Sequence, residues 1–246
     1  MSKSFASIPF LFLSIVLFAV LTTRTLYIHN NSVLSRDSTQ YILLAEEWIQ
    51  NKEFPSRIIT LNKMNDIPPL YLGIVYTATK FNVSSKNASI ALNVGFFFIF
   101  VLLLYKMILL ITRSKKIAAV VALCSIIHPT LLRYSCEAQR DMLYITLSTA
   151  FIYCCFNILK RNKTLDYMGC SLTVYLLLLT RYESLEFLCI IGFVFVYKII
   201  SCSLKTNEIA KIILFATELT ILSIVSNKAF GNIWSMTEYY GGRINI

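Results

Sequence analysis

The feature that most constrains the fold is a series of long, mostly apolar segments separated by shorter polar ones. A helix that crosses the roughly 30 Å hydrocarbon core of a membrane needs about 20 such residues, and its backbone polar groups must pair within the helix. The segments that approach this length lie at about 7–28, 88–111, 117–134, 141–159, 166–181, 184–202 and 210–227. The sequence therefore predicts an all-α, polytopic membrane bundle with about seven transmembrane helices.

Composition supports this class. Hydrophobic residues make up 57% of the 246 residues, whereas ordinary soluble domains contain about 45–50% apolar residues even when glycine is counted. We find no repeat and no low-complexity tract, so we expect a single transmembrane domain over residues 1–246.

The 7 cysteines lie mostly in apolar runs without the spacing of metal sites, and we interpret them as small buried hydrophobic residues. Because the first run continues to Ile28 without a cleavage site, we predict an uncleaved first span.

Loop charge predicts the orientation. The largest polar interruption, residues 29–86, contains the short apolar stretch Pro69–Phe81, whose length suits a juxtamembrane helix better than a span. Lysine and arginine in short loops are retained in the cytoplasm. The basic segments at 113–116, 160–163 and 198–211 share that side only if Pro69–Phe81 does not cross. We therefore expect a multi-pass protein with a cytoplasmic N-terminus, and with 29–86 as its first extracytoplasmic loop.

One carboxylate in this loop is a candidate for chemistry. Asp37, Tyr41 and Ala45 follow one another at helical spacing, so a helix from residue 38 would place Asp37 at its N-cap or first turn. There Asp37 is either a simple N-cap, a general base for an acceptor hydroxyl, or a cation ligand. Pro68 and Pro69 fix two backbone angles, and they predict the sharp start of a second helix in the same loop.

The junction between the third and fourth predicted spans gathers charge at the outer face. Arg133, Glu137, Arg140 and Asp141 lie within nine residues, and Arg133 with Glu137 has the spacing of an intrahelical ion pair. The other use of these arginines is to grip a phosphate or diphosphate, for which the planar guanidinium is well suited. We interpret His128, which precedes Pro129, as a helix-end cap.

Two further charged positions interrupt apolar runs. Arg181, followed by Glu183, ends the fifth predicted span and is either structurally paired or an anion site. Glu218 lies in the middle of the seventh. A carboxylate inside a membrane span marks a functional site by default, and the alternative is a hydrogen bond to the neighbouring Thr217 or Thr220.

The order of these features resembles a known enzyme class, the GT-C glycosyltransferases of the protein-mannosyltransferase type (family 39) and their aminoarabinose-transferase relatives. The resemblance covers roughly residues 7–200. It rests on the Asp-x-x-x-Tyr-x-x-x-Ala pattern from Asp37, the Pro-Pro-Leu-Tyr motif at 68–71, the His-Pro segment at 128–141, and Leu-Thr-Arg-Tyr-Glu at 179–183.

The resemblance implies an inverting membrane glycosyltransferase that moves a hexose such as mannose from a polyprenyl-phosphate donor to an extracytoplasmic protein, lipid or glycan acceptor. It implies a bacterial inner membrane or an ER-like membrane, and no nucleic-acid partner. Asp37 would be the essential acidic residue of the first outer loop, acting as a base or orienting the acceptor nucleophile, with or without a divalent cation. Arg133, Arg140 and Arg181 would bind the donor phosphate. Supporting positions would be Tyr41, Pro68, Pro69, Glu137, Asp141 and Glu183.

The chain also departs from the family pattern. Members often carry Asp-Glu where this chain has Asp37 and Ser38, and fuller members continue with more spans and often a soluble outer domain, whereas this sequence ends at Ile246. One alternative is therefore a truncated, non-catalytic membrane subunit. The other is a lipid or solute carrier in which Glu218 and Arg181 line a polar path.

Overall fold

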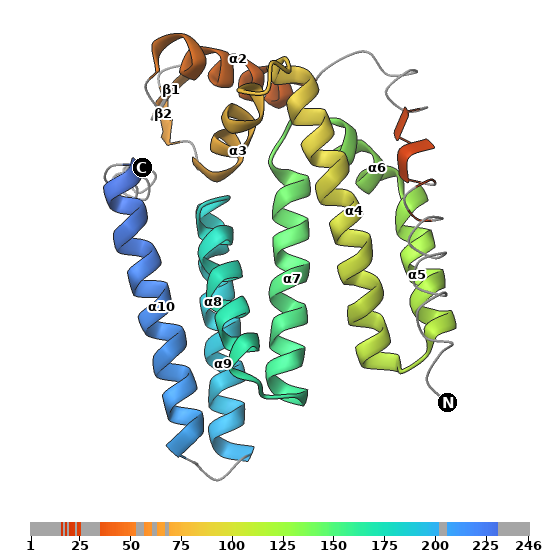
Figure 1. Cartoon of the computed structure of the whole chain (residues 1–246), viewed down its shortest axis with the longest axis vertical. Coiled ribbons are helices and arrows are strands. Elements are labelled where there is room, and N and C mark those ends of the chain that lie inside the picture. The colour runs from red at the N-terminus through yellow and green to blue at the C-terminus, as the bar shows by residue number, and fades with distance from the viewer. Residues whose placement is uncertain are drawn as a thin grey trace. The chain divides into compact units, whose positions relative to one another are not determined.

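The computed structural model describes residues 16, 18, 20–22, 24, 25, 35–52, 57–60, 63–66, 69–201 and 206–230. Within them the predicted helical class is confirmed (Figure 1). The elements in chain order are α2 (Arg36–Asn51), β1 (Arg57–Thr60), β2 (Lys63–Asp66), α3 (Pro69–Thr79), α4 (Ser85–Thr112), α5 (Lys115–Ile127), α6 (Pro129–Cys136), α7 (Asp141–Lys160), α8 (Thr164–Leu178), η1 (Tyr182–Leu185), α9 (Glu186–Ser201) and α10 (Thr206–Phe230).

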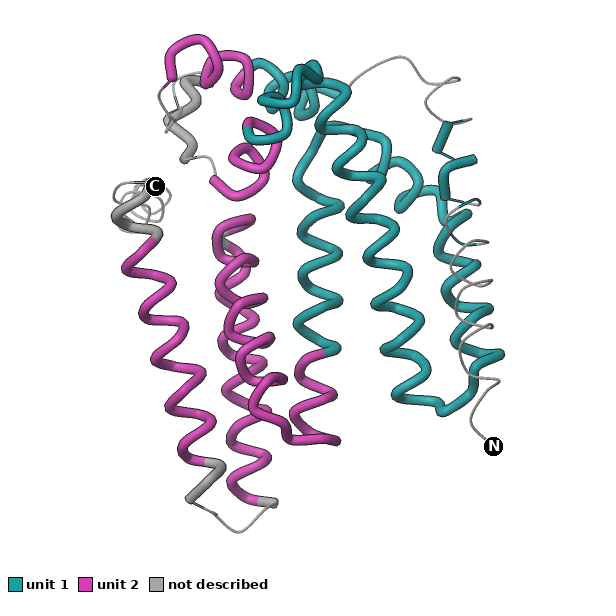
Figure 2. The backbone as a smooth tube through the Cα atoms, in the orientation of Figure 1, with its two compact units in different colours: residues 1–43, 77–153 teal, residues 44–76, 154–246 magenta. Residues whose placement is uncertain are grey.

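These elements fall into two compact units (Figure 2). Unit 1 comprises residues 1–43 and 77–153, and unit 2 comprises residues 44–76 and 154–246. The boundaries lie inside the helices α2, α3 and α7 rather than in linkers. The single domain expected over residues 1–246 stays a prediction.

Two helices in the described part of the chain, α4 and α7, are each long and apolar enough to cross a membrane. The Ser84 hydroxyl caps the start of α4 by accepting a hydrogen bond from the Asn87 amide at 3.4 Å. The helix ends at Arg113, whose left-handed backbone (φ 57°) lets its N–H bond to the Leu109 carbonyl. The bounds of both helices agree with the predicted spans 88–111 and 141–159.

The predicted span 117–134 is two helices rather than one. α5 and α6 are bent by 62° at the break between them, and together they count as at most one further span. Proline has no N–H to continue the hydrogen-bond ladder, and its ring clashes with the carbonyl four residues earlier. Pro129 therefore ends α5 and starts α6 as its first residue. His128 joins the two helices, but its side chain makes no capping hydrogen bond.

Three of the remaining predicted spans correspond to helices of the described part of the chain that are not counted as membrane-crossing. α8, α9 and α10 coincide with the segments predicted at 166–181, 184–202 and 210–227, but they do not meet the length and composition of a crossing helix. Most of the first predicted span, 7–28, lies outside the described residues. The count of seven spans stays a prediction.

The first loop contains the two expected helices and one unexpected element. α2 begins beside Asp37, and α3 begins at Pro69, as the double proline predicts. Between them β1 and β2 form an antiparallel hairpin that pairs Arg57 with Asp66 and Thr60 with Lys63. Its short strands show no clear alternation of apolar and polar residues, which is why the sequence pattern did not reveal it.

Each unit has its own packed interior. In unit 1, α4, α5 and α7 meet around the buried side chains Phe97, Val101, Ile126 and Met142. In unit 2, α8 packs along α10, and Phe195 of α9 meets the Phe215 ring edge-on at 5.2 Å.

Candidate functional site

Asp37 is an exposed residue in the first turn of α2. The cap of this helix is Ser35, whose hydroxyl oxygen accepts a hydrogen bond from the Ser38 amide at 3.2 Å, while its carbonyl accepts one from the Thr39 amide at 3.0 Å. The alternative that Asp37 is a simple N-cap is therefore wrong. No hydrogen bond or ion pair of the Asp37 carboxylate is found among the described residues. Its negative charge is favoured there by the helix dipole.

The other residues of this motif point inward. Tyr41 is half-buried and Ala45 is fully buried. One side of α2 is therefore packed, while Asp37 lies on its exposed side. This arrangement leaves the carboxylate accessible to a second molecule.

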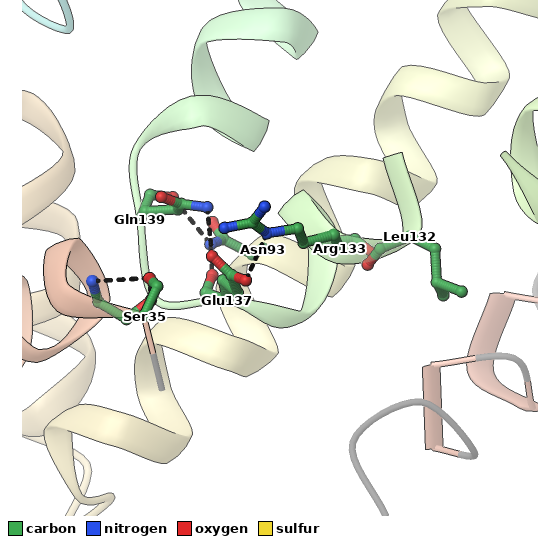
Figure 3. Close-up of polar contacts among 8 residues, drawn as sticks. Ser35, Asn93, Leu132, Arg133, Glu137 and Gln139 are labelled. Carbon is green, nitrogen blue, oxygen red and sulfur yellow. Dashed lines mark hydrogen bonds and ion pairs between the residues drawn. The ribbon is translucent and has the colours of Figure 1, made fainter. Parts of the chain in front are cut away.

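The predicted pair at the end of α6 is confirmed. The Arg133 Nε donates to Glu137 Oε1 at 2.7 Å, and the Arg133 side chain is 56% exposed whereas that of Glu137 is 14% exposed. The second carboxylate oxygen of Glu137 accepts a hydrogen bond from Gln139 Nε2 at 2.7 Å. Both oxygens of Glu137 are thus committed to holding the turn between α6 and α7, and the guanidinium of Arg133 is oriented by that contact (Figure 3).

The buried amide side chain of Asn93, on α4, holds the turn between α6 and α7. The Asn93 Nδ2 group donates to the Glu137 carbonyl, and to the Gln139 carbonyl at 2.9 Å. Asn93 is fully buried, and its Oδ1 has no hydrogen-bond partner in the described part of the chain. Figure 3 shows Asn93, Glu137, Gln139 and Arg133 converging at this point.

Arg24, in the first predicted span, is buried at 1% exposure. Its Nη1 donates to the Ile126 carbonyl at 2.7 Å, and its Nε donates to the Ser135 hydroxyl at 2.8 Å. The guanidinium also lies 3.7 Å from the centroid of the Phe97 ring. Ile126 is in the last turn of α5, whose carbonyls lose their helical partners at the break. Arg24 therefore caps α5 while also holding α6.

These groups share one end of unit 1. Figure 2 shows the teal start of α2 at the same end as α6 and the first turns of α4 and α7. The basic turn at Arg113 and Ser114, between α4 and α5, lies at the opposite end (Figure 1). Asp37, Arg133 and Arg140 are thus at one end of the unit. Arg140, half-buried, directly precedes α7, and Asp141 occupies the first turn of that helix.

Unit 2 brings together two other motifs of the resemblance. The Leu70 amide at the start of α3 donates to the Leu179 carbonyl at 3.2 Å, so the segment from Pro69 meets the chain that leads to Arg181. Pro69 and Tyr71 are buried, and Thr180 is fully buried. Pro68 lies outside the described residues.

Arg181 itself caps the 3-10 turn η1 through its backbone. Its amide donates to the Leu177 carbonyl at 2.9 Å, and its carbonyl accepts a hydrogen bond from the Ser184 amide at 3.1 Å. The side chain is half-buried, and Glu183 is exposed. Arg181 belongs to unit 2, whereas Asp37, Arg133 and Arg140 belong to unit 1.

Glu218 lies half-buried on α10, and its Oε2 has no hydrogen-bond partner among the described residues. The hydroxyls of Thr217 and Thr220 donate instead to the Ile213 and Ala216 carbonyls, each at 2.8 Å. The neighbouring threonines therefore do not donate a hydrogen bond to this carboxylate, so the alternative of a Thr217 or Thr220 hydrogen bond to Glu218 is wrong.

The part of the chain that the structure describes contains no group of side chains suited to bind a metal ion, and its cysteines are free. No three His, Cys, Asp or Glu side chains are grouped there as metal ligands. The described cysteines are unbridged, as expected, and Cys136, Cys155 and Cys170 are buried. The expectation of burial is wrong for Cys124 and Cys189, which are exposed on apolar helices.

Comparison of the chain with protein-family models, with curated proteins and with solved structures finds no match in any of the three. The resemblance to the GT-C glycosyltransferases therefore rests on the four sequence motifs alone. Sequence reasoning did not single out Arg24 or Asn93. The signal was available, because a charged or amide side chain inside an apolar span must face the protein interior or another polar group.

Proposed function

We propose that this protein is a multi-pass membrane glycosyltransferase that transfers a sugar from a polyprenyl-phosphate donor to an extracytoplasmic acceptor. The observation that carries the proposal is the position of Asp37. It is exposed in the first turn of α2 without a capping role, because Ser35 performs that role. An exposed acidic group without a structural task is suited to act on a second molecule.

The proposed topology has seven spans and a cytoplasmic N-terminus. It places the start of α2 and the turn between α6 and α7 on the outer face. Two observations support it: these elements share one end of unit 1, and the basic turn at Arg113 lies at the other end. In unit 2, the contact between Leu70 and Leu179 also joins two of the motifs on which the resemblance depends.

The proposed reaction is a single in-line displacement. The Asp37 carboxylate takes the proton of an acceptor hydroxyl, whose oxygen forms a bond to the anomeric carbon of the sugar. The bond from that carbon to the phosphate oxygen breaks, and its electron pair leaves with the polyprenyl phosphate, so the configuration inverts. Arg133 and Arg140, which belong to the same unit as Asp37, are proposed to stabilise the phosphate charge, as preorganised cations do in phosphate chemistry.

The test is transfer of a radiolabelled sugar from a polyprenyl-phosphate donor by membranes that contain the full chain. A positioned general base contributes about 10²–10⁴-fold, so we expect Asp37→Asn to reduce the rate at least about 100-fold. Glu46→Gln is the matched control, because Glu46 is an exposed acid on the same helix, and it should retain the rate. Full activity of Asp37→Asn would remove the proposed catalytic role.

A lipid carrier is the second candidate, and Glu218 is the observation that favours it. A half-buried carboxylate oxygen without a hydrogen-bond partner in the described residues is costly on an apolar helix unless it faces a polar path. The test is transbilayer movement of a fluorescent phospholipid in proteoliposomes. A carrier would lose this movement in Glu218→Gln and keep it in Asp37→Asn, whereas a glycosyltransferase would show the reverse pattern in the sugar-transfer assay.

A further inference from the structure

The end of α4 and the start of α5 carry a concentrated positive charge. Four basic residues, here called the basic cluster, lie within eleven positions, and all four are exposed: Lys106, Arg113, Lys115 and Lys116. Arg113 is the C-cap of α4, and the last two lysines occupy the first turn of α5. Because the start of a helix is the positive end of its dipole, these two lysines add to a charge that already favours an anion.

Unit 1 supplies no counter-charge at this end. The acidic residues in its sequence are Asp37, Glu137 and Asp141. They belong to the start of α2 and to the turn between α6 and α7, which lie at the opposite end of the unit (Figure 1). No ion pair of Lys106 or Arg113 is found in the described part of the chain. The anion that would balance the basic cluster therefore comes from outside unit 1.

The depth of Lys106 indicates where this anion lies. α4 has 28 residues and is therefore about 42 Å long, which matches the roughly 40–45 Å thickness of a bilayer with its headgroups. Lys106 precedes the last residue of α4 by six positions, or about 9 Å. A headgroup layer is about 5–7 Å thick on each side. When α4 crosses a membrane, the Cα of Lys106 therefore lies just inside the hydrocarbon.

The surroundings of Lys106 on the helix are apolar. The residues one turn away in both directions are all leucines, at positions 102, 103, 109 and 110. A lysine placed in this way keeps its methylene chain in the hydrocarbon and extends its ammonium group to the phosphate layer. This ammonium group therefore meets lipid phosphates, whereas a soluble anion or an acidic peptide is kept away by the surrounding lipid.

Arg113 lies at the outer edge of the same layer. It follows Lys106 by seven positions, which is about two helical turns, so the two Cα atoms lie along one side of α4. The two cations therefore bracket the depth at which lipid phosphates lie. A zwitterionic headgroup carries its own cation, whereas an anionic headgroup leaves its negative charge for the protein, and basic segments beside a membrane span favour the anionic kind.

We propose that the basic cluster binds anionic phospholipids of the leaflet at this end of α4, with Lys106 and Arg113 on the phosphate of one lipid. The inference rests on α4 crossing the membrane. It does not depend on sugar transfer, because its test measures lipid binding alone, and it holds for either orientation of the chain.

The experiment is native mass spectrometry of the full chain in mild detergent, with phosphatidylglycerol and phosphatidylcholine at equal concentrations. We expect phosphatidylglycerol to be retained in preference. Lys106→Gln and Arg113→Gln should each reduce this preference about fivefold, and Lys106→Arg should keep it because the charge is retained. Arg36→Gln is the matched control, since it removes the same charge from an exposed position at the other end of unit 1. It should not change the preference.

Four outcomes would overturn the proposal. Equal retention of the two phospholipids by the parent protein would exclude a headgroup preference. An unchanged preference in Lys106→Gln would remove the lysine contact on which the depth argument depends. An equal loss in Arg36→Gln would show that total charge, and not the basic cluster, sets the preference. Release of bound phosphatidylglycerol by millimolar inorganic phosphate would assign the cluster to a soluble anion.

Discussion

At the scale of single residues, the polar groups inside the apolar interior do more than the exposed charges. Arg24 satisfies a carbonyl at the end of α5 and a hydroxyl on α6, and Asn93 holds two carbonyls of the next turn. An exposed ion pair such as Arg133 with Glu137 contributes about 0–1 kcal/mol. A buried carbonyl that loses its donor costs about 1–3 kcal/mol. The geometry of the candidate site therefore depends mainly on the two buried side chains.

The first prediction at the scale of residues is that Arg24→Lys destabilises the protein more than Arg24→Met does. Arg24→Lys keeps a buried charge but lacks the planar fork that reaches both Ile126 and Ser135, so we expect a loss of about 3 kcal/mol or more. Arg24→Met removes the charge and leaves one carbonyl without its donor, at about 1–3 kcal/mol. The unfolding midpoint in detergent measures both. Arg36→Lys, on the exposed start of α2, should not change it, and a lysine variant more stable than the methionine variant would refute the account.

A second prediction concerns the amide of Asn93. Asn93→Leu conserves approximate volume but removes both donated hydrogen bonds, for an expected loss of about 1–3 kcal/mol. Asn93→Asp replaces the donor with a buried oxygen that faces the Glu137 and Gln139 carbonyls, so it should be more destabilising than leucine. Thermal unfolding of the purified variants gives the order. Aspartate tolerated as well as leucine would mean that the two carbonyl contacts do not stabilise this turn.

At the scale of elements, the length of each apolar run was sufficient to predict a helix, but it did not predict where one of these helices breaks. The bounds of α4 and α7 follow from local composition and from caps such as Ser84. The break at Pro129 was visible in the sequence, yet the apolar run on both sides of it favoured one continuous span. What sequence could not supply is the partner across the break. That partner is Arg24, about a hundred positions away in the chain, and no local pattern relates the two.

The prediction at the scale of elements distinguishes the capping role of Ser35 from the proposed catalytic role of Asp37 at the start of α2. Ser35→Ala should weaken the first turn by about 1 kcal/mol, which is about fivefold faster exchange of the Ser38 amide hydrogen. Asp37→Asn should leave that exchange rate nearly unchanged, because the Ser35 hydroxyl still accepts from the same amide. Hydrogen exchange followed by mass spectrometry reports both. Equal acceleration in the two variants would return Asp37 to a capping role.

At the scale of the whole molecule, the sequence predicts seven membrane spans. The helices lie where the apolar runs predict them, whereas two of them, or three with the bent pair, have the length and composition of a membrane span in the described residues. α8, with 15 residues, is shorter than the roughly 20 that a span needs. The positions of charged loops therefore carry the proposed orientation, and they can be tested directly.

The whole-molecule prediction is a labelling pattern. In a variant in which all native cysteines are replaced by serine, single cysteines are introduced as Thr39→Cys, Lys116→Cys and Arg161→Cys. A membrane-impermeant maleimide should label the first from outside intact cells, and the other two only after the membrane is opened, because basic loops stay in the cytoplasm. Labelling of Lys116→Cys and Arg161→Cys from outside would mean that α3 crosses the membrane and that the proposed orientation is inverted.

The contact between Arg24 and the α5 end also sets an order of events during synthesis. The two bonded residues are 102 positions apart, and at a ribosomal rate of about 5–20 residues per second the partner emerges roughly 5–20 s after the arginine. In the proposed seven-span topology, the first helix carries throughout this interval a charge that the bilayer interior disfavours. In that topology we expect the nascent helix to stay at the interface or within the insertion machinery until α5 arrives. We therefore expect the N-terminal half to insert in one delayed step rather than as a succession of independent insertions.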